Sequence, residues 1–372
     1  MTRPRLRAAI AGFGHMHVNE IAEYLDGQPD FALVGAADVP LDLEELTATR
    51  YTRAWNQANV AERFHTPIFP SVAQMLDQLH PDICFILCDN AHKLATVQLC
   101  AERHIDVSIE KPLACSLDEA REIQRIVRQA GIQAVVNWPV IWRPYVQTFA
   151  NAVTSGLCGR LIRLNYQNGH TGPLGIGAKH RGVAQAAEDI SDAARARTWW
   201  YNRIYGGGAA LDIGCYGCFF SQWLQPDQPV AASAIAMNLA TPAANTEDHL
   251  AYLIRYPHAL TVAEGTWTAP GASLPAGPTA FCTNGVISCV RQPDASVAVT
   301  AMDLCGNPID VPAAPDSPYL KNLPWNLAGN RLHGLPLHPT VNLDHNVRIM
   351  ALLDAAIQAA ALHREVPVTH LD

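Results

Sequence analysis

The sequence contains no long hydrophobic run and no excess of basic residues. None of its segments approaches the roughly 18 consecutive apolar residues that a membrane-spanning helix needs. The chain of 372 residues has 26 lysines and arginines against 34 aspartates and glutamates, giving a formal net charge of −8. Nucleic acids and anionic membranes bind cationic surfaces, so we expect neither as the main partner. The absence of a signal-type apolar stretch after Met1 predicts a soluble, cytoplasmic protein.

Paired metal-binding cysteine motifs are also missing. The ten cysteines are scattered along the chain, and no CxxC motif is followed by a second one at zinc-finger spacing. The single CxxC, formed by Cys215 and Cys218, lies among aromatic and aliphatic residues in a segment that predicts a helix. We therefore interpret the cysteines as buried free thiols.

The length predicts two domains, which we place at residues 1–140 and 141–372. In the first, short apolar runs alternate with helical patterns. Ser116 and Glu119 form a capping box at the start of the last of these helices, and Gly131 follows its end. Parallel strands joined by helices predict a doubly wound Rossmann-type α/β domain. Its strands are expected at 6–11, 32–37, 83–88, 107–109 and 133–136, and its helices at 15–25, 71–79, 92–103 and 117–129.

The pattern changes after a helix expected at 145–153. Strands then follow one another without helices between them, and Asn284-Gly285 is a strong hairpin signal. This half therefore predicts an α+β domain with a large, mostly antiparallel open sheet. The proline-rich stretch 305–340 is expected to be a long loop, followed by a final helix at 344–363. The strands are expected at 161–167, 230–238, 250–256, 260–267, 280–282, 286–290 and 297–302.

A glycine motif, GFGHMH at residues 12–17, directly follows the first strand and opens the first helix. In a dinucleotide-binding fold the first glycine makes the tight turn, and the second lets the backbone approach the pyrophosphate. His17 stands where a third glycine usually allows close packing of helix and strand. An ordinary glycine turn is the alternative reading of this short motif.

Asp38 ends the second predicted strand. A carboxylate there accepts hydrogen bonds from the adenosine ribose and repels a 2′-phosphate. No arginine follows it immediately, so NAD is favoured over NADP. The alternative is a turn aspartate before Pro40.

His15 and His17 also form an HxH motif after the first strand, which is how metal-dependent hydrolases with a (β/α)8 barrel begin. Such a barrel needs parallel strands throughout, whereas the second half predicts antiparallel ones. We therefore assign no metal ligands.

Glu110-Lys111-Pro112 follows the fifth predicted strand, at the sheet edge where open α/β folds bind ligands. An ammonium group there can hold a substrate hydroxyl and stabilise alkoxide charge. Partial burial is expected to lower the pKa of Lys111 and allow proton relay. Pro112 is compatible with a cis bond.

The third constellation is GGGAALDIGCY at residues 206–216. Asp212 and Tyr216 are four residues apart and share one face of a helix. A carboxylate and a phenol on one face suit a polyol, because one orients a hydroxyl and the other exchanges its proton. Read alone, the segment is a glycine turn that opens an amphipathic helix.

Together these elements resemble the family that contains glucose-fructose oxidoreductase, inositol 2-dehydrogenase and dimeric dihydrodiol dehydrogenase, over essentially the whole chain. The resemblance implies an NAD-dependent oxidoreductase acting on CH–OH groups of a sugar, cyclic polyol or related compound. It implies that Lys111, Asp212 and Tyr216 are the catalytic residues, and Tyr216 stands where many members have histidine. The implied cofactor-binding residues are Gly12, Phe13, Gly14, His15, Met16, Asp38, Glu110 and Lys111.

Substrate contacts are expected from Lys111, Arg143, Asp212 and Tyr216, with specificity set by residues 169–205. That segment carries His170, Lys179, His180, Arg181, Trp199, Trp200 and Arg203. The resemblance also implies a homodimer or homotetramer formed through the antiparallel sheet. A non-catalytic NAD-bound sensor and an NAD-dependent glycosidase are the alternative functions.

Overall fold

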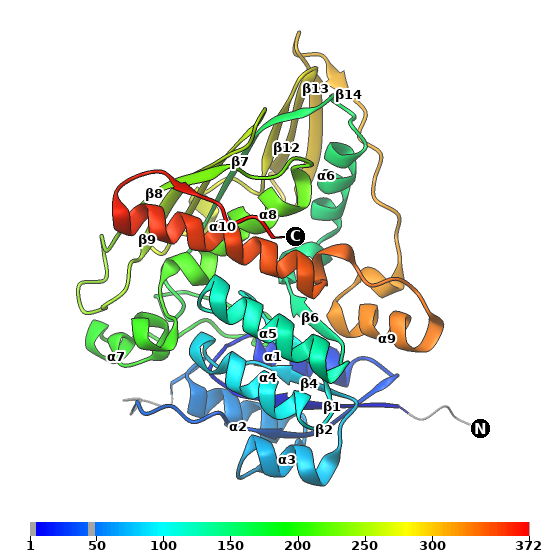
Figure 1. Cartoon of the computed structure of the whole chain (residues 1–372), viewed down its shortest axis with the longest axis vertical. Helices are drawn as coiled ribbons and strands as arrows, with labels where there is room; N and C mark the ends of the chain where they lie inside the picture. Colours follow the sequence, from blue (N-terminus) through cyan, green and yellow to red (C-terminus); the bar gives the residue numbers. More distant parts are fainter. Residues whose placement is uncertain (1–4, 44–48, 372) are drawn as a thin grey trace.

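The structure is a computed structural model that describes residues 5–43 and 49–371. It contains two sheets, one in each half of the chain (Figure 1). In Figure 1 the first sheet and its helices form the lower part of the molecule, and the second sheet forms the upper part. The long helix α10 (Leu343–Leu362) runs between them and packs against elements of both. The predicted fold class is confirmed.

The first sheet is six-stranded, parallel throughout, and has the order β3-β2-β1-β4-β5-β6. The order reverses between β1 and β4, so a crevice for ligands is expected at the carboxyl ends of these strands. The strands are β1 (Leu6–Ala11), β2 (Phe31–Ala37), β3 (Ile68–Phe69), β4 (Ile83–Ile86), β5 (Asp106–Glu110) and β6 (Ala134–Asn137).

Among the described residues, five α-helices flank this sheet: α1 (Val18–Asp26), α2 (Arg53–Arg63), α3 (Val72–Leu79), α4 (Lys93–Ala101) and α5 (Leu117–Ala130). The caps of α5 are confirmed: the Ser116 side chain accepts a hydrogen bond from the Glu119 amide, and Gly131 is left-handed with φ 66°. The sequence missed α2 because only Asn56 and Val60 of this polar helix are buried, which leaves no apolar stripe to recognise. It also missed the short β3. The first helix begins at Val18 rather than at residue 15.

The second sheet has nine strands in the order β14-β13-β12-β11-β7-β10-β9-β8-β15. Every pair is antiparallel except β7 with β10, which is parallel. The strands are β7 (Leu161–Gly169), β8 (Ala231–Met237), β9 (His249–Arg255), β10 (Leu260–Thr266), β11 (Thr279–Cys282), β12 (Gly285–Arg291), β13 (Val297–Asp303), β14 (Pro308–Ile309) and β15 (Val366–Pro367).

The predicted hairpin joins β11 and β12, but its turn is displaced by one residue. Cys282 pairs with Gly285, so Thr283 and Asn284 form the loop and Gly285 begins β12. A Cβ atom on Gly285 would lie 2.3 Å from the Met302 carbonyl oxygen. The glycine is therefore needed for the close approach of β13 rather than for the turn.

The expectation of one long loop over 305–340 is wrong. This stretch contains β14 and the helix α9 (Leu323–His333). Asn322 caps α9, and Pro324 lies in its first turn, where the missing amide costs no hydrogen bond. A high proline content therefore did not argue against a helix at this position.

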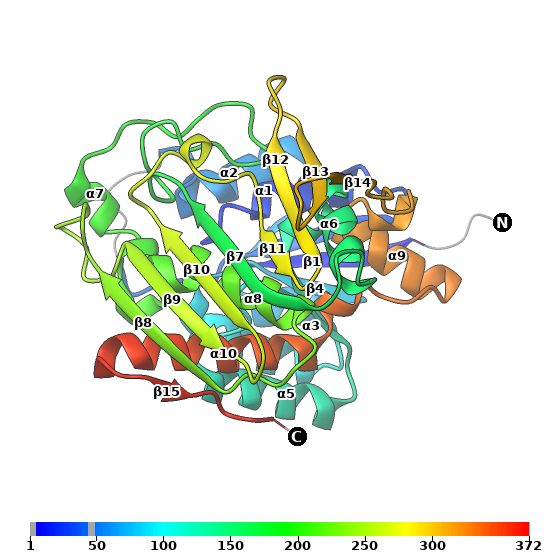
Figure 2. The same cartoon turned by 90° about the horizontal axis from the view of Figure 1, so that it is seen from above.

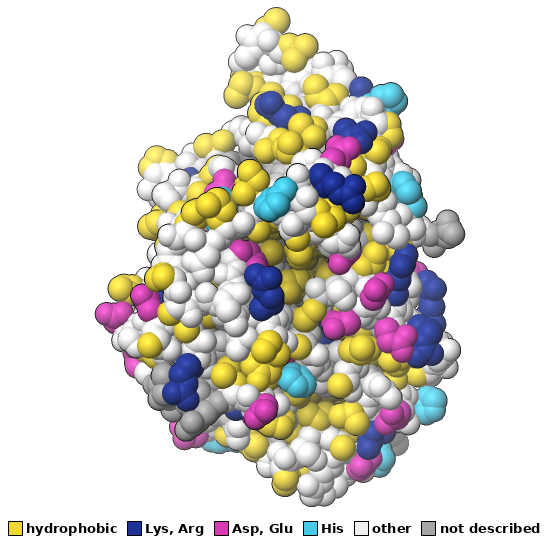
Figure 3. Space-filling model, turned by 60° about the vertical axis from the view of Figure 1, so that its left-hand side comes forward, with side chains coloured by type: hydrophobic (Ala, Val, Ile, Leu, Met, Phe, Trp, Pro, Cys, Tyr) yellow, Lys and Arg dark blue, Asp and Glu magenta, His cyan; other side chains and the backbone are white. Residues whose placement is uncertain are grey.

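The remaining α-helices are α6 (Pro144–Thr154), α7 (Asp192–Ala196) and α8 (Cys215–Leu224). Figure 2 shows α8 and α10 behind the strands of the second sheet, whose other face is open. All ten cysteines are free, and Cys115 and Cys305 are the two that are not buried. Within residues 5–43 and 49–371 no helix is long and apolar enough to cross a membrane. On the face shown in Figure 3, basic and acidic side chains are interspersed with hydrophobic ones.

Candidate active site

The glycine turn lies between β1 and α1, as the sequence predicts. Gly12 has φ 91°, and a Cβ atom there would lie 2.5 Å from the Cys88 amide nitrogen. Close packing against the end of β4 thus requires this glycine. Among the described residues, no acceptor bonds the amides of Gly14 and Met16. Two unpaired amides at a helix amino terminus fit the pyrophosphate of a dinucleotide.

Side chains from residues 169–205 cover this turn. The Trp199 indole nitrogen donates a hydrogen bond of 2.7 Å to the Gly14 carbonyl oxygen, and the Trp200 ring centroid lies 4.8 Å from that of His15. Gly14, His15 and Met16 are all buried. The backbone of the turn fits the cofactor, but in this conformation the two tryptophans occupy the approach to it.

Asp38 follows β2 at the position predicted for the ribose carboxylate. Its Oδ1 accepts a hydrogen bond from the Val39 amide, and its Oδ2 lies 3.0 Å from Arg53 Nη1. Burial raises the pKa of Asp38, and the nearby Arg53 opposes that shift. Because Arg53 comes from α2, fifteen residues further along the chain, a search for an adjacent arginine missed it.

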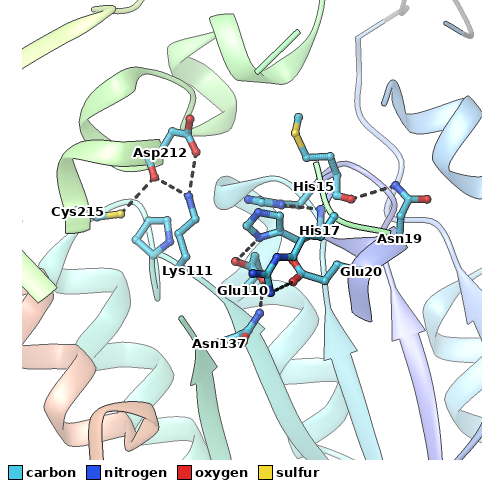
Figure 4. Close-up of polar contacts among 12 residues, drawn as sticks. His15, His17, Asn19, Glu20, Glu110, Lys111, Asn137, Asp212 and Cys215 are labelled. Atoms are coloured by element: carbon cyan, nitrogen blue, oxygen red, sulfur yellow. Dashed lines mark hydrogen bonds and ion pairs between the residues drawn. The ribbon is translucent and has the colours of Figure 1, made fainter. Parts of the chain in front are cut away.

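Lys111 follows β5 and makes a buried ion pair with Asp212 from the second half of the chain (Figure 4). Its Nζ donates to the Asp212 carbonyl oxygen at 2.5 Å and to Oδ1 at 2.9 Å. The Trp267 indole nitrogen donates to Asp212 Oδ2 at 2.9 Å, and His170 Nε2 lies 3.4 Å from the same oxygen. Both carboxylate oxygens therefore have partners within the protein. The Lys111–Pro112 bond is cis.

The pair contradicts the expected lowering of the Lys111 pKa. Burial alone would lower the pKa of Lys111, but the Asp212 carboxylate outweighs burial and raises it above its usual value. Burial would likewise raise the pKa of Asp212, yet Lys111 and His170 bring it well below its usual range. Both groups are thus charged at neutral pH, and Lys111 is an ammonium donor rather than a neutral base.

Asp212 and Tyr216 were expected on one face of a single α-helix, but only Tyr216 lies in an α-helix. Asp212 lies in a π-helical turn (Ala210–Gly214), and Tyr216 is the second residue of α8. Both side chains still meet at Lys111, whose Nζ lies 5.2 Å from the centroid of the Tyr216 ring. Burial is the main cause of a raised pKa of Tyr216, so its phenol is protonated at neutral pH.

His17 occupies the position of the usual third glycine and pairs with Glu110. Its Nδ1 lies 3.0 Å from Glu110 Oε1, while Asn137 donates to Oε2 at 3.0 Å (Figure 4). Burial would lower the pKa of His17, but Glu110 raises it. Burial and the neighbouring His17 lower the pKa of His15, which is neutral.

His15, His17 and Glu110 bring possible metal-ligand atoms within 4.8 Å of one another. However, the His17 amide donates to His15 Nδ1 at 3.2 Å, and Glu110 Oε1 is engaged by His17. His15 Nδ1, His17 Nδ1 and Glu110 Oε1 are thus engaged by hydrogen bonds, whereas His15 Nε2 is buried and has no partner among the described residues. The alternative (β/α)8 barrel is wrong, because the second half forms a mixed, mostly antiparallel sheet.

A cavity of about 190 Å³ opens next to these groups. Its wall includes His17, Tyr166 and Tyr216, together with Arg143 from the start of α6. The structure therefore places Arg143 and Tyr216 at one cavity; Lys111 does not line it, but its Nζ lies 5.2 Å from the centroid of the Tyr216 ring. A hollow of about 550 Å³ on the open face of the second sheet shares Tyr166 with this cavity and is otherwise lined by different residues.

The structure places the named side chains of the segment 169–205 in different parts of the molecule. Lys179, His180 and Arg181 line the cavity, and His170 contacts Asp212. Trp199 and Trp200 lie on the glycine turn instead, while Arg203 lines a separate hollow beside the glycine triplet.

Sequence reasoning missed three supporting residues. Trp267 fixes Asp212, and Asn137 fixes Glu110. Lys93 is fully buried and donates at 2.6 Å to the carbonyl oxygens of both Glu110 and Pro112, and burial lowers its pKa to about 8. Asn137, which ends β6 next to β5, could have been found by asking which side chains follow neighbouring parallel strands.

A dinucleotide-binding domain joined to an open-sheet domain, with a lysine–aspartate pair between them, defines a class of two-domain oxidoreductase. Residues 6–138 match the family described as "Oxidoreductase family, NAD-binding Rossmann fold", and residues 146–288 match "GFO/IDH/MocA C-terminal domain". The chain belongs to the Gfo/Idh/MocA oxidoreductase family.

Among curated proteins, the chain is similar to D-xylose dehydrogenase of Paenarthrobacter nicotinovorans. The two are 30% identical over 137 residues, which is 36% of this chain and 31% of that protein. The match therefore spans less than a third of the relative's length.

Solved structures with the same fold cover nearly the whole chain. Aldose-aldose oxidoreductase from Caulobacter crescentus, complexed with glycerol, has a TM-score of 0.74 and 18% identity, and the match covers 98% of this chain and 99% of that one. The WlbA dehydrogenase from Bordetella pertussis, with NADH and UDP-GlcNAcA, has a TM-score of 0.73 and 18% identity, covering 99% and 100%. An oxidoreductase from Agrobacterium radiobacter, with NAD+, L-tartaric acid and magnesium, has a TM-score of 0.73 and 15% identity, covering 98% of each.

Proposed function

We propose that this protein is an NAD-dependent dehydrogenase or reductase that transfers a hydride between nicotinamide and a carbinol or carbonyl carbon of a sugar, cyclic polyol or related compound. The observation that carries the proposal is the buried Lys111–Asp212 pair, which lies at the carboxyl edge of the first sheet and beside the Tyr216 cavity. The sugar activities named for the xylose and aldose enzymes support the substrate class.

The unpaired amides of Gly14 and Met16, together with Asp38, would hold the dinucleotide. When bound, nicotinamide supplies the hydride acceptor or donor. Phe13, His15 and Glu110 complete the proposed cofactor-binding residues. The carboxylate of Asp38 favours NAD over NADP. Because Asp38 is paired with the cation Arg53, this preference is to be tested by measuring the binding of both cofactors.

The protein's own groups handle the oxygen of the substrate. Lys111 is an ammonium with three donors, of which Asp212 takes two, so its third can bind a reacting oxygen and stabilise negative charge on it. Tyr216 is a protonated phenol and gives its proton to a carbonyl oxygen. Because both groups are protonated, each can donate a hydrogen bond to the oxygen of a substrate. Asp212 holds Lys111 in its charged form.

The cofactor reaches the turn only after Trp199 and Trp200 move, because the turn is buried beneath them. The segment 169–205 would move aside when the dinucleotide binds and then close over it. This closure would exclude water from the reaction.

We also propose a cytoplasmic homodimer or homotetramer that associates through the open face of the second sheet. Ile162, Ile235 and Leu253 are exposed there, and such apolar surface is typical of an interface.

The test is to incubate the protein with NADH and a panel of ketoses, inosose-type ketones and sugar acids, and in reverse with NAD and the alcohols, while following absorbance of the reduced nicotinamide. Turnover of any sugar or polyol supports the proposal. Cofactor binding without turnover would favour a sensor, and release of a free sugar from an aryl glycoside without net NADH would favour a glycosidase.

A further inference from the structure

The cavity beside Tyr216 has two kinds of wall. Its inner part holds the phenols of Tyr216 and Tyr166, both mostly buried, and its rim carries the exposed cations Arg143, Lys179 and Arg181. In the part of the chain that the structure describes, neither phenol hydroxyl has a hydrogen-bond partner. Two free hydroxyl groups inside a cavity of about 190 Å³ suit a ligand of monosaccharide size with several oxygens.

The positive charge on the rim is only partly balanced. Glu20 is the acid of the cavity wall, and it is already engaged by Arg181 at 3.7 Å and by the Tyr24 hydroxyl. Arg143 donates to the Tyr145 hydroxyl at 3.1 Å, and within residues 5–43 and 49–371 it has no acidic partner. Lys179 has no hydrogen bond or ion pair in the same described range.

The other titratable groups facing the cavity do not balance this charge. The Glu110 carboxylate is paired with His17, so it leaves no free negative charge that could balance the cations. Burial is the main cause that lowers the pKa of His180 to about 3, and His180 is therefore neutral. The positive charges of Arg143 and Lys179 thus remain available to a ligand.

We propose that the substrate is a monosaccharide that carries an anionic group, a carboxylate or a phosphate, and that Arg143 and Lys179 bind this group. A guanidinium presents paired donors that match a carboxylate or phosphate, and an ammonium adds a point charge. The proposal rests on the oxidoreductase function above and narrows its substrate class, because a neutral sugar would leave both cations without a partner.

The experiment compares the wild-type protein with Arg143→Gln and Lys179→Gln. The ligands are glucuronate, glucose 6-phosphate and glucose. Calorimetry in the presence of NAD measures binding, and absorbance of the reduced nicotinamide measures kcat/KM. Arg291→Gln is the matched control, because Arg291 is an exposed arginine at the end of β12 that does not line the cavity.

The expected result is that one of the two anionic sugars binds at least tenfold more tightly than glucose. Each cavity variant should reduce this preference at least tenfold, and Arg291→Gln should leave it unchanged. A preference for glucuronate identifies a carboxylate, and a preference for glucose 6-phosphate identifies a phosphate. Equal or better binding of glucose, no binding of any of the three, or a preference unaffected by both cavity variants would overturn the inference. Binding with the expected preference but without turnover would leave the inference standing and count against the hydride-transfer function.

Discussion

The pairing of Lys111 with Asp212 decides the chemistry at the scale of single residues. A buried charge is tolerated only when it is paired and hydrogen-bonded. Here the ammonium has two bonds to Asp212, and Trp267 and His170 complete the shell of the carboxylate. The pair therefore holds a buried ammonium group at the candidate site and links the end of β5 to the π-helical turn that precedes α8.

Replacing Lys111 with alanine should remove most turnover while leaving NAD affinity nearly unchanged. The lost interaction is with the reacting oxygen, and a single donor or general acid of this kind contributes about 10²–10³-fold to the rate. The measurements are kcat and the dissociation constant of NAD. Unchanged turnover would contradict the role of Lys111.

The same variant removes the ammonium partner of the buried Asp212 carboxylate and leaves it only Trp267 and His170. Breaking a buried ion pair in this way costs about 3–5 kcal/mol of stability. The double variant Lys111→Met/Asp212→Asn is therefore the matched control, since it removes both charges. We expect urea unfolding to show a more stable protein in the double than in the single variant, with turnover low in both.

His17 should make the stability of the protein depend on pH. Its pKa is raised in the folded protein by Glu110, so its contribution is full below about pH 6.5, the value of an unperturbed histidine. The contribution declines as the pH rises through the folded-state pKa. We predict that His17→Gln costs more stability at pH 6 than at pH 8.5, measured by urea unfolding. A larger cost at pH 8.5 would show that His17 is not held as a cation by Glu110.

At the scale of elements, residues 169–205 act as a cover on the glycine turn. Trp199 and Trp200 stack on each other with ring centroids 3.8 Å apart, and they belong to a buried cluster with Met16, Tyr51 and Tyr201. This cluster is separate from the main hydrophobic core. Its separation allows the cover to open without disrupting the two sheets.

Trp199→Ala should open the cover, because it removes the indole bond to Gly14 and a large buried ring. We expect amide hydrogen exchange of residues 12–17 to accelerate by about tenfold or more, and NAD to associate faster. Trp223→Ala removes an indole from α8 instead and should leave exchange at the turn unchanged. Equal exchange in wild type and Trp199→Ala would show that Trp199 does not limit access.

The elements themselves were largely predictable where local signals are strong. The strands of the Rossmann-type sheet other than the short β3 follow from apolar runs, and the capped α5 follows from Ser116, Glu119 and Gly131. The polar α2 and the proline-initiated α9 were not predictable, since neither presents an apolar stripe or an uninterrupted helical pattern. The parallel pairing of β7 with β10 depends on strand order, which the local sequence does not encode.

The residues of the candidate site were likewise predictable where a local motif marks them and unpredictable where it does not. The motifs singled out Lys111, Asp212 and Tyr216, and these residues meet in space although they follow a strand, lie in a π-helical turn and lie in α8 respectively. The direction of the Lys111 pKa shift was wrong because the expectation considered burial without the Asp212 partner. Trp267 and Arg53 reach their partners only through the tertiary fold, so their positions in the sequence carried no signal for these contacts.

At the scale of the whole molecule, the open face of the second sheet exposes apolar side chains that a single chain does not cover. Ile235 and Leu253 lie on adjacent strands on that face, with 64% and 41% of their surface exposed. We predict that Ile235→Glu/Leu253→Glu converts an oligomer into monomers in light scattering, because buried unpaired carboxylates oppose association. Ile204→Glu, which alters an exposed isoleucine away from the sheet, is the control. An unchanged oligomer in the double variant would place the interface elsewhere.

The central claim is that a dinucleotide lies at the β1–α1 turn with its reactive ring beside Lys111. The most direct measurement is single-turnover reduction of a carbonyl substrate by NADH in the wild type and in Lys111→Ala. The account predicts rapid loss of nicotinamide absorbance in the wild type and a rate about 10²–10³-fold lower in the variant, with equal amounts of bound NADH. Failure of the wild type to bind NADH, or equal rates in both proteins, would contradict it.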